Sequence, residues 1–216
     1  MKKIMFGVAC ISASLCLQTH AAVANNGKLS LNKNNIKVWT FPNPNSPNLT
    51  YKAETTLNVP IERAVALVLD VQRTAQWAPH VSKVEVLSRN DQKGEFSIYM
   101  VLDFPFPLQD RDLIVAGKVT KDSQGVIRIQ NRAIAQGKAL DSSYVRLKQY
   151  QGDWVFQKID ANNVKVMMSG FANPEGSIPT SVANMFVEQQ PYQTLQKMKT
   201  ELAKNPTLPA LPAAIR

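Results

Sequence analysis

Arg111 is the charged side chain whose setting most suggests ligand chemistry. It lies between Asp110 and Asp112, directly after a proline-rich stretch at residues 104–107. A guanidinium can hold a phosphate or a carboxylate through two parallel hydrogen bonds, so Arg111 could anchor an anionic group at a cavity. The plainer alternative is an arginine that pairs with a neighbouring carboxylate and has only a structural role.

The supply of cysteine and histidine limits the reactions that this chain could perform. Both cysteines, Cys10 and Cys16, and one of the two histidines, His20, lie in the first 24 residues. If that segment is removed, no thiol remains and His80 is the single histidine. A histidine-rich metal site is then excluded, and a Ser-His-Asp relay would depend on one residue. We therefore expect neither a metal nor a cofactor.

An enzyme would also need an acid or a base of tuned pKa that faces its substrate. The spacing of the available groups forms no recognisable catalytic constellation. The candidates are Tyr99, Asp103, Arg111, Tyr144 and Glu188.

The beginning of the chain has the parts of a secretory signal peptide. A positive start at residues 1–3 precedes an apolar run at residues 4–17 and an Ala-x-Ala end. We expect cleavage after Ala24, or after Ala21. The apolar run is too short to span a bilayer, so we expect export to the periplasm without an anchor.

The remaining chain is basic, because loss of the two lysines in this segment lowers the formal charge from +9 to +7. Lys and Arg are scattered, with no basic run and no nucleic-acid motif, so we expect no nucleic-acid partner. The charge is either an ordinary solvated surface or a weak attraction to anionic membrane.

Residues 177–204 are predicted to form one long helix, because apolar residues recur there at helical spacing. Asn205 and Pro206 end it, since the residue before proline avoids the helical conformation. Pro191 lies inside the pattern and predicts a kink or a break. The apolar positions are Val182, Met185, Phe186, Tyr192, Leu195, Met198 and Leu202.

A shorter helix is predicted at residues 61–70, and most of the segment between the two helices has the period of two that is typical of strands. Runs of strands flanked by helices indicate an α+β domain with a curved antiparallel sheet. Residues 41–48 carry three prolines and are expected to form no regular element. The expected strands are 36–40, 51–59, 84–87, 95–104, 112–120, 126–134, 144–150, 153–159 and 164–171.

The organisation expected from these elements is a single domain at residues 51–204. Residues 25–50 would be an N-terminal extension. Residues 205–216, which contain three prolines, would be an extended and mobile tail.

Three phrases in this order resemble a START (steroidogenic acute regulatory-related lipid transfer) domain, nearest to its phosphatidylcholine-transfer members. The first, at residues 104–112, is a proline-rich loop that ends in Arg-Asp before a strand. The second is residues 145–150, with Trp154 shortly after. The third, at residues 170–179, leads into the terminal helix and is similar to the Asn-Pro-Gly-Gly-x-Ile-Pro phrase of those members. The resemblance covers residues 51–204.

The resemblance implies a helix-grip fold, in which the curved sheet wraps the terminal helix and leaves an internal hydrophobic cavity. Such domains bind one lipid or sterol and generally catalyse nothing, and we expect a monomer. A lipid cavity needs apolar walls and a few polar groups that orient the ligand. The residues expected to contact the ligand are Trp77, Ile98, Tyr99, Met100, Leu102, Arg111, Met168, Val182, Met185 and Phe186.

The identity of the ligand stays open because two features depart from the phosphatidylcholine-transfer pattern. Those members place an arginine just ahead of Gln-Trp, whereas Gln76 and Trp77 follow Ala75 here and Arg73 is displaced by one residue. They also use tryptophan and tyrosine to cage the quaternary ammonium, whereas here Tyr99 is present but its neighbour is Met100. The expected ligands are a phospholipid, a fatty acid or a sterol-like molecule. The second hypothesis is an enzyme of the same broad fold, such as a cyclase, an aromatase or a hydrolase that acts on a hydrophobic substrate.

Overall fold

The computed structural model describes residues 27–216 and, within that range, leaves out the side chain of Met185. The signal peptide expected at residues 1–24 lies outside the described residues. One sheet of ten strands forms the body of the domain, in the order β1-β2-β3-β10-β9-β7-β6-β5-β4, and β8 adds a short parallel pairing with β6. The strands are β1 Lys28–Lys33, β2 Ile36–Asn43, β3 Ser46–Leu57, β4 Val81–Asn90, β5 Glu95–Leu102, β6 Arg111–Lys121, β7 Ile127–Ala133, β8 Val145–Arg146, β9 Tyr150–Lys158 and β10 Val164–Ala172.

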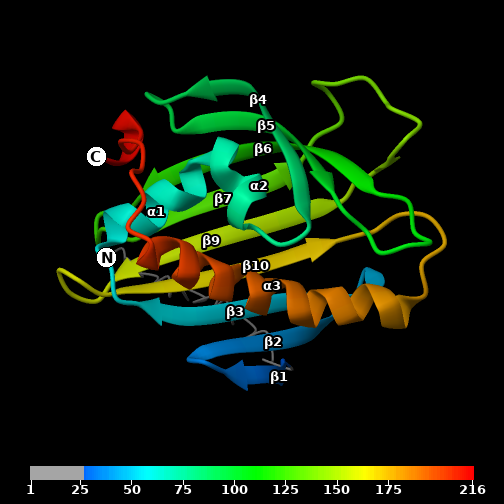
Figure 1. Ribbon diagram of the computed structural model, residues 1–216, viewed down its shortest axis with the longest axis horizontal. Helices are drawn as coiled ribbons and strands as arrows, with labels where there is room; N and C mark the ends of the chain where they lie inside the picture. Colours follow the sequence, from blue (N-terminus) through cyan, green and yellow to red (C-terminus); the bar gives the residue numbers. More distant parts are fainter. Residues whose placement is uncertain (1–26) are drawn as a thin grey trace, which may run out of the picture.

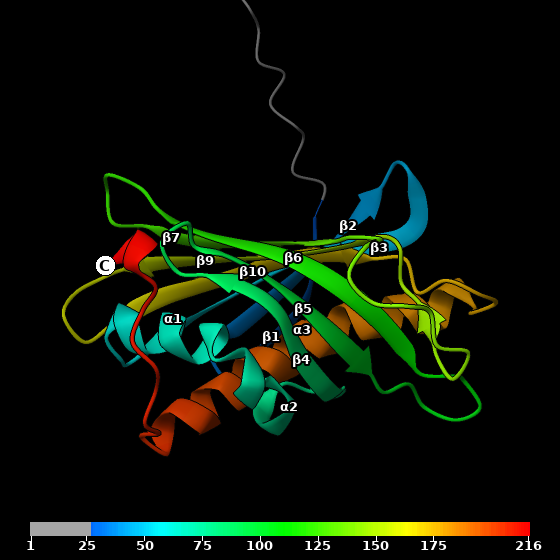
Figure 2. The same cartoon turned by 90° about the horizontal axis from the view of Figure 1, so that it is seen from above.

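The helices all lie on one side of this sheet, as Figures 1 and 2 show. Helices α1 (Ile61–Leu69) and α2 (Thr74–Trp77) carry the chain from β3 to β4, an edge strand. The long helix α3 (Thr180–Ala203) lies along the concave face. The predicted α+β fold, a curved antiparallel sheet with a long terminal helix, is confirmed.

Alternate strand residues fill the space between the sheet and the helices. Phe156, Val164 and Val166 are fully buried in the same cluster as Leu195 and Met198 of α3. The period of two places these strand residues on the concave face. Each large apolar side chain buried there contributes about 1.5–3 kcal/mol, so this contact holds the C-terminal half of α3 on the sheet.

The convex face of the sheet carries a smaller core of its own. Tyr99 and Ile114 are buried there together with the partly buried Tyr144, which belongs to the connection that follows β7. Beneath it, Arg146 and Asp112 form a buried ion pair with an Nε–Oδ1 distance of 2.7 Å. This end of the sheet is therefore covered on both faces.

The N-terminal residues expected as an extension are part of the sheet. Strands β1, β2 and the start of β3 occupy them, and the expectation of no regular element at residues 41–48 is wrong. Pro42 is tolerated because the β2–β3 register shifts between Phe41 and Asn43, where a ladder hydrogen bond is not needed.

The C-terminal residues pack on the domain instead of leaving it as a tail. Ile215 is 1% exposed and lies in the short 3₁₀ turn η2 (Ala213–Ile215). The amide of Ala214 donates to the carbonyl of Asp91, and Arg63 donates to the carbonyl of Pro206. The prolines make this segment extended, but its hydrogen bonds hold it against the domain.

The structure also differs from two local predictions near the cavity. Strand 144–150 shrinks to the two residues of β8, and β9 starts at Tyr150. Helix α3 runs without a break through Pro191, which is buried. The missing amide of Pro191 costs the helix one hydrogen bond, and the contacts of Leu195 and Met198 with the sheet hold the chain in place.

Candidate ligand-binding site

Two adjoining hollows lie between the concave face of the sheet and α3. The one toward the loops at the end of the sheet, the mouth compartment, has a volume of about 150 Å³. The one toward α1 and α2, the core compartment, has a volume of about 120 Å³. Tyr51, Tyr150 and Gln190 line both hollows and form the partition between them.

The mouth compartment is framed by loops and by the first turns of α3. Phe186 lies with its ring centroid 5.4 Å from that of Phe104 and 5.9 Å from that of His80. Leu102 and Ala183 complete the apolar wall. Of the residues expected to contact a ligand, Leu102 and Phe186 therefore line this compartment.

The core compartment has mostly apolar walls and, among its described lining residues, one buried donor without a hydrogen-bond acceptor. The predicted residues Trp77, Ile98, Met100 and Met168 all line it. The Trp77 side chain is 5% exposed, and its indole N–H has no hydrogen-bond acceptor within the described part of the chain. A buried donor without a partner costs free energy.

The partition depends on two glycines in the floor of the sheet. A Cβ atom on Gly152 would lie 2.2 Å from the Tyr150 hydroxyl oxygen, and one on Gly170 would lie 2.7 Å from the Tyr51 hydroxyl oxygen. The two phenols therefore rest on bare backbone, one on β9 and one on β10. Sequence reasoning missed both tyrosines, although glycines inside strands indicate a close approach of another group.

Three of the other predicted residues do not meet the cavity in the structure. Tyr99 lies in the convex core, because it alternates with Ile98 and Met100 along β5. Val182 on α3 is half-buried and lines neither compartment. The side chain of Met185 lies outside the described residues.

Arg111 is, after Tyr99 and Val182, the third predicted residue that does not line the cavity, because it lies behind the cavity wall. It is 3% exposed and stacks on the Phe104 ring at 4.4 Å from the centroid. Its guanidinium donates to the carbonyls of Gln109, Pro174 and, at 3.3 Å, Glu175. Burial lowers the pKa of Arg111. Instead of anchoring a ligand, it ties β6 and Phe104 to the loop that leads into α3.

The lining of both compartments contains few charged residues. Among the described lining residues there is no Lys or Arg, and His80 and Asp103 are exposed at the mouth. The carboxylate of Asp153 is paired with Arg132. Burial raises the pKa of Tyr150 to about 12 and also raises that of Tyr51, so both remain neutral phenols at physiological pH.

These phenols predict a loss of stability at alkaline pH. An unfolded tyrosine ionises near pH ~10, whereas folded Tyr51, Tyr99 and Tyr150 stay protonated to higher pH. The unfolded state therefore loses protons first, and stability should fall between pH ~10 and ~12, by up to ~1.4 kcal/mol per pH unit for each group. Urea unfolding from pH ~8 to ~11.5 measures this dependence. Equal slopes for wild type and Tyr150→Phe would contradict it.

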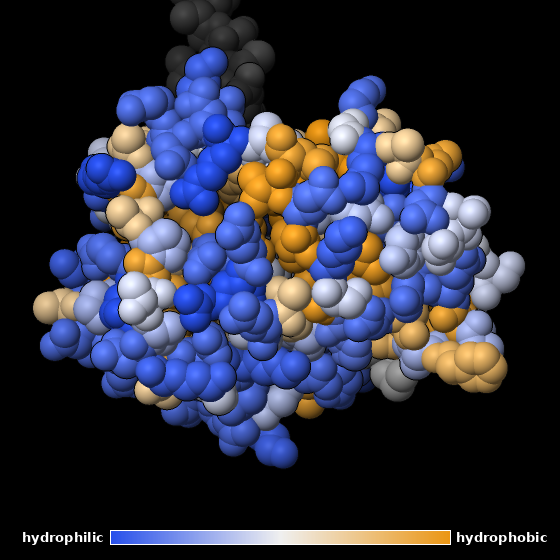
Figure 3. Space-filling model, turned by 45° about the horizontal axis from the view of Figure 1, so that its top comes forward, coloured by the Kyte–Doolittle hydropathy of each residue, from blue (hydrophilic) through white to orange (hydrophobic). Residues whose placement is uncertain are grey.

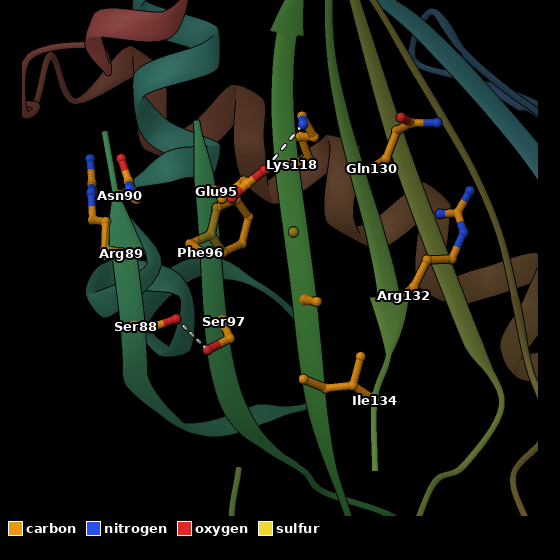
Figure 4. A pocket seen from close by; sticks show the side chains of 12 residues that line it. Ser88, Arg89, Asn90, Glu95, Phe96, Ser97, Lys118, Gln130, Arg132 and Ile134 are labelled. Atoms are coloured by element: carbon orange, nitrogen blue, oxygen red, sulfur yellow. Dashed lines mark hydrogen bonds and ion pairs between the residues drawn. The ribbon is translucent and has the colours of Figure 1, made fainter. Parts of the chain in front are cut away.

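The convex face carries a wide, shallow groove of a different character (Figure 4). Its volume is about 660 Å³, and its charged side chains are paired, Lys118 with Glu95 at 3.1 Å and Arg132 with Asp153. The Ser88 and Ser97 hydroxyls share a hydrogen bond of 2.7 Å. Such an open, polar surface does not suit a hydrophobic ligand.

Two further features concern metals and membranes. Within residues 27–216, no three His, Cys, Asp or Glu side chains are grouped as metal ligands. No helix in the same range is both long enough and apolar enough to cross a bilayer.

Comparisons with known proteins place these features in a family context. A family model described as START domain matches residues 18–207. An uncharacterized protein of Pseudomonas aeruginosa is 23% identical over 85% of this chain and 90% of its own length. The phosphatidylcholine transfer protein of Bos taurus is 30% identical over 54% of this chain, and the match covers 55% of that relative, about half its length.

Solved structures show the same fold. A fragment of a STAR-related lipid transfer protein from Xanthomonas axonopodis superposes with a TM-score of 0.76 and 28% identity, over 82% of this chain and 98% of that one. The Zhui aromatase/cyclase from Streptomyces has a TM-score of 0.53 and 15% identity over 72% of this chain and 94% of that one, a likeness of fold alone.

Proposed function

Because this chain belongs to the START domain family, we propose that it is a non-catalytic lipid-binding or lipid-transfer protein. It holds one hydrophobic ligand, a phospholipid, a fatty acid or a sterol-like molecule, between the sheet and α3. The observation that carries the proposal is the two-compartment cavity, whose walls are largely apolar and carry a few uncharged polar groups. This is the composition that a lipid site needs.

We propose that the protein acts as a monomer after export to the periplasm. The support for export is the pattern of residues 1–24, a positive start followed by an apolar run and an Ala-x-Ala end. The support for a monomer is that the cavity is enclosed by elements of one chain.

The end of the molecule beside the mouth compartment is the surface proposed to meet a membrane. Phe106 is 96% exposed on the loop after β5, and Leu140 is 78% exposed on the loop after β7. The two loops adjoin, since Gln109 donates to the carbonyl of Ser142 at 2.9 Å. Figure 3 shows one face of the molecule on which apolar residues gather among hydrophilic ones.

Replacement of Phe106 by serine should slow lipid transfer between anionic vesicles by about five- to tenfold, because insertion of the ring into the bilayer would be lost. Equilibrium affinity for the lipid and the melting temperature should change little. Ile159→Ser is the matched control, since Ile159 is 54% exposed and follows β9 at the other end of the sheet (Figure 1). Equal transfer rates for the two variants would refute this membrane contact.

The alternative, an enzyme such as a cyclase, an aromatase or a hydrolase, has less support from the geometry. Tyr99 and Tyr144 lie in the convex core, and Asp103 is exposed at the rim. The titratable groups at the centre of the cavity are two phenols, Tyr51 and Tyr150, and burial raises the pKa of both. Neither is a base at neutral pH, which leaves a general base to be found elsewhere.

Native mass spectrometry of the purified protein, with extraction and identification of bound molecules, tests the proposed function. One lipid bound per chain is expected, and added lipid should raise the melting temperature of stripped protein. An empty protein whose melting temperature no lipid raises would reject the carrier hypothesis.

A further inference from the structure

The partition at the centre of the cavity presents hydrogen-bonding groups that the fold leaves unused. Within residues 27–216, neither the Tyr51 hydroxyl nor the Tyr150 hydroxyl forms a hydrogen bond with another group of the protein, although each is a donor and an acceptor. Gln190 reaches the same place from α3. These groups face space that is apolar on either side, so a ligand polar group between two apolar parts would fit here.

A third donor without a partner belongs to a residue deeper in the molecule. Trp77 lines the core compartment, and its buried indole N–H has no acceptor among the described residues. It comes from α2, whereas Tyr51 and Tyr150 come from β3 and β9. Side chains from three elements therefore line the core compartment, and the two phenols supply the groups for a ligand oxygen.

The lack of positive charge in the described part of the cavity limits the kind of chemical group to which that ligand oxygen can belong. Among the described lining residues there is no Lys or Arg, and the nearby cation Arg111 is engaged by three backbone carbonyls. A phosphate or carboxylate at the partition would be buried without a counter-charge, which is strongly unfavourable. A hydroxyl or an ester carbonyl needs only the hydrogen bonds that the partition offers.

We propose that the cavity selects an uncharged lipid whose hydroxyl or carbonyl group is held by Tyr51, Tyr150 and Gln190, and that it rejects lipids with an anionic group at that position. This inference rests on the proposed lipid-binding function and names the class of ligand. The volumes of the compartments, about 150 and 120 Å³, favour a single acyl chain or a compact ring system over two long chains.

Two probes that differ by one phosphate group test the proposal on the full-length, lipid-stripped protein. 1-Monooleoylglycerol and 1-oleoyl-lysophosphatidic acid share the acyl chain, the ester and the glycerol, and the second adds a phosphate. Binding can be followed through tryptophan fluorescence, since Trp77 and Trp154 line the core compartment. The uncharged probe should bind at least about tenfold more tightly, a difference of ~1.4 kcal/mol.

Removal of either partition hydroxyl should weaken binding of the uncharged probe. Tyr51→Phe and Tyr150→Phe keep the rings on their glycines, and each should lower its affinity about three- to tenfold, the effect of one neutral hydrogen bond. Tyr144→Phe is the matched control, because Tyr144 lies in the convex core and should leave binding unchanged. Unchanged melting temperatures would show that the variants fold.

The outcomes separate this inference from the function on which it rests. Equal or tighter binding of lysophosphatidic acid, or wild-type affinity in both Phe variants, overturns the inference and leaves lipid binding intact. If wild type binds neither probe and no lipid raises its melting temperature, the proposed function fails, and the inference fails with it.

Discussion

Replacement of Asp112 by alanine should lower the free energy of unfolding by about 3–5 kcal/mol, the cost of leaving a buried charge without its partner. Asp112 is 1% exposed and accepts two hydrogen bonds from Arg146, at 2.7 and 2.9 Å. Burial raises the pKa of Tyr99, and the negative charge of Asp112, to which its hydroxyl is hydrogen-bonded, raises it further. The substitution would thus leave the Arg146 guanidinium and the Tyr99 hydroxyl buried without their common partner.

Equilibrium unfolding in guanidinium chloride measures this loss. Glu95→Ala is the matched control, because Glu95 forms an exposed pair with Lys118 at a similar 3.1 Å, and its loss should cost less than ~1 kcal/mol. Adding Arg146→Met to Asp112→Ala should restore part of the stability, since the stranded charge is removed. A loss of under ~1 kcal/mol for Asp112→Ala alone would mean that water reaches the pair.

Replacement of Ala183 by phenylalanine should abolish most lipid binding while leaving the fold intact. Ala183 is 8% exposed on α3 and lines the mouth compartment opposite Leu102 and Phe171. A phenyl ring there would occupy space proposed for the ligand, so the affinity should fall by at least about tenfold, or ~1.4 kcal/mol. Filling part of this hollow with a phenyl ring should leave the melting temperature unchanged or higher.

The measurement is titration of stripped protein with 1-monooleoylglycerol or with a lipid that co-purifies, followed by fluorescence or calorimetry. Ala203→Phe supplies the matched control, because Ala203 is exposed at the end of the same helix and touches neither compartment. Wild-type affinity in Ala183→Phe would place the ligand somewhere other than the mouth compartment. A lower melting temperature would mean that the ring does not fit the hollow.

Local chemistry explains which elements could be predicted. Proline at position 60 and the helical spacing after Ile61 predict α1, and the period of two predicts most strands. The hairpin of β1 and β2 was missed, although its turn has positive φ at Asn34 and Asn35, a conformation that asparagine tolerates well. The β2–β3 hairpin was not predicted because three prolines lie close together in it. The sheet tolerates Pro42 because the β2–β3 register shifts between Phe41 and Asn43.

The candidate site could be predicted only in part, for a physical reason that Tyr99 illustrates. The period of two places Ile98 and Met100 on one face of β5 and Tyr99 on the other. It does not reveal which polar side chains form hydrogen bonds with each other, and Tyr99 is bonded to Asp112 on the convex face. The roles of the cavity-lining residues in binding stay predictions until a ligand is identified.

The fold class, the long terminal helix and the apolar face of most strands could be predicted from the amino-acid sequence, because they follow from contacts between near neighbours in the chain. The contacts of the polar residues depend on the tertiary fold. Tyr51 and Tyr150 meet from strands that lie on either side of β10, and Arg111 turns its guanidinium to carbonyls more than 60 residues away instead of to a ligand. Such partners are set by the curvature of the sheet and the packing of α3, which bring together groups that no local pattern connects.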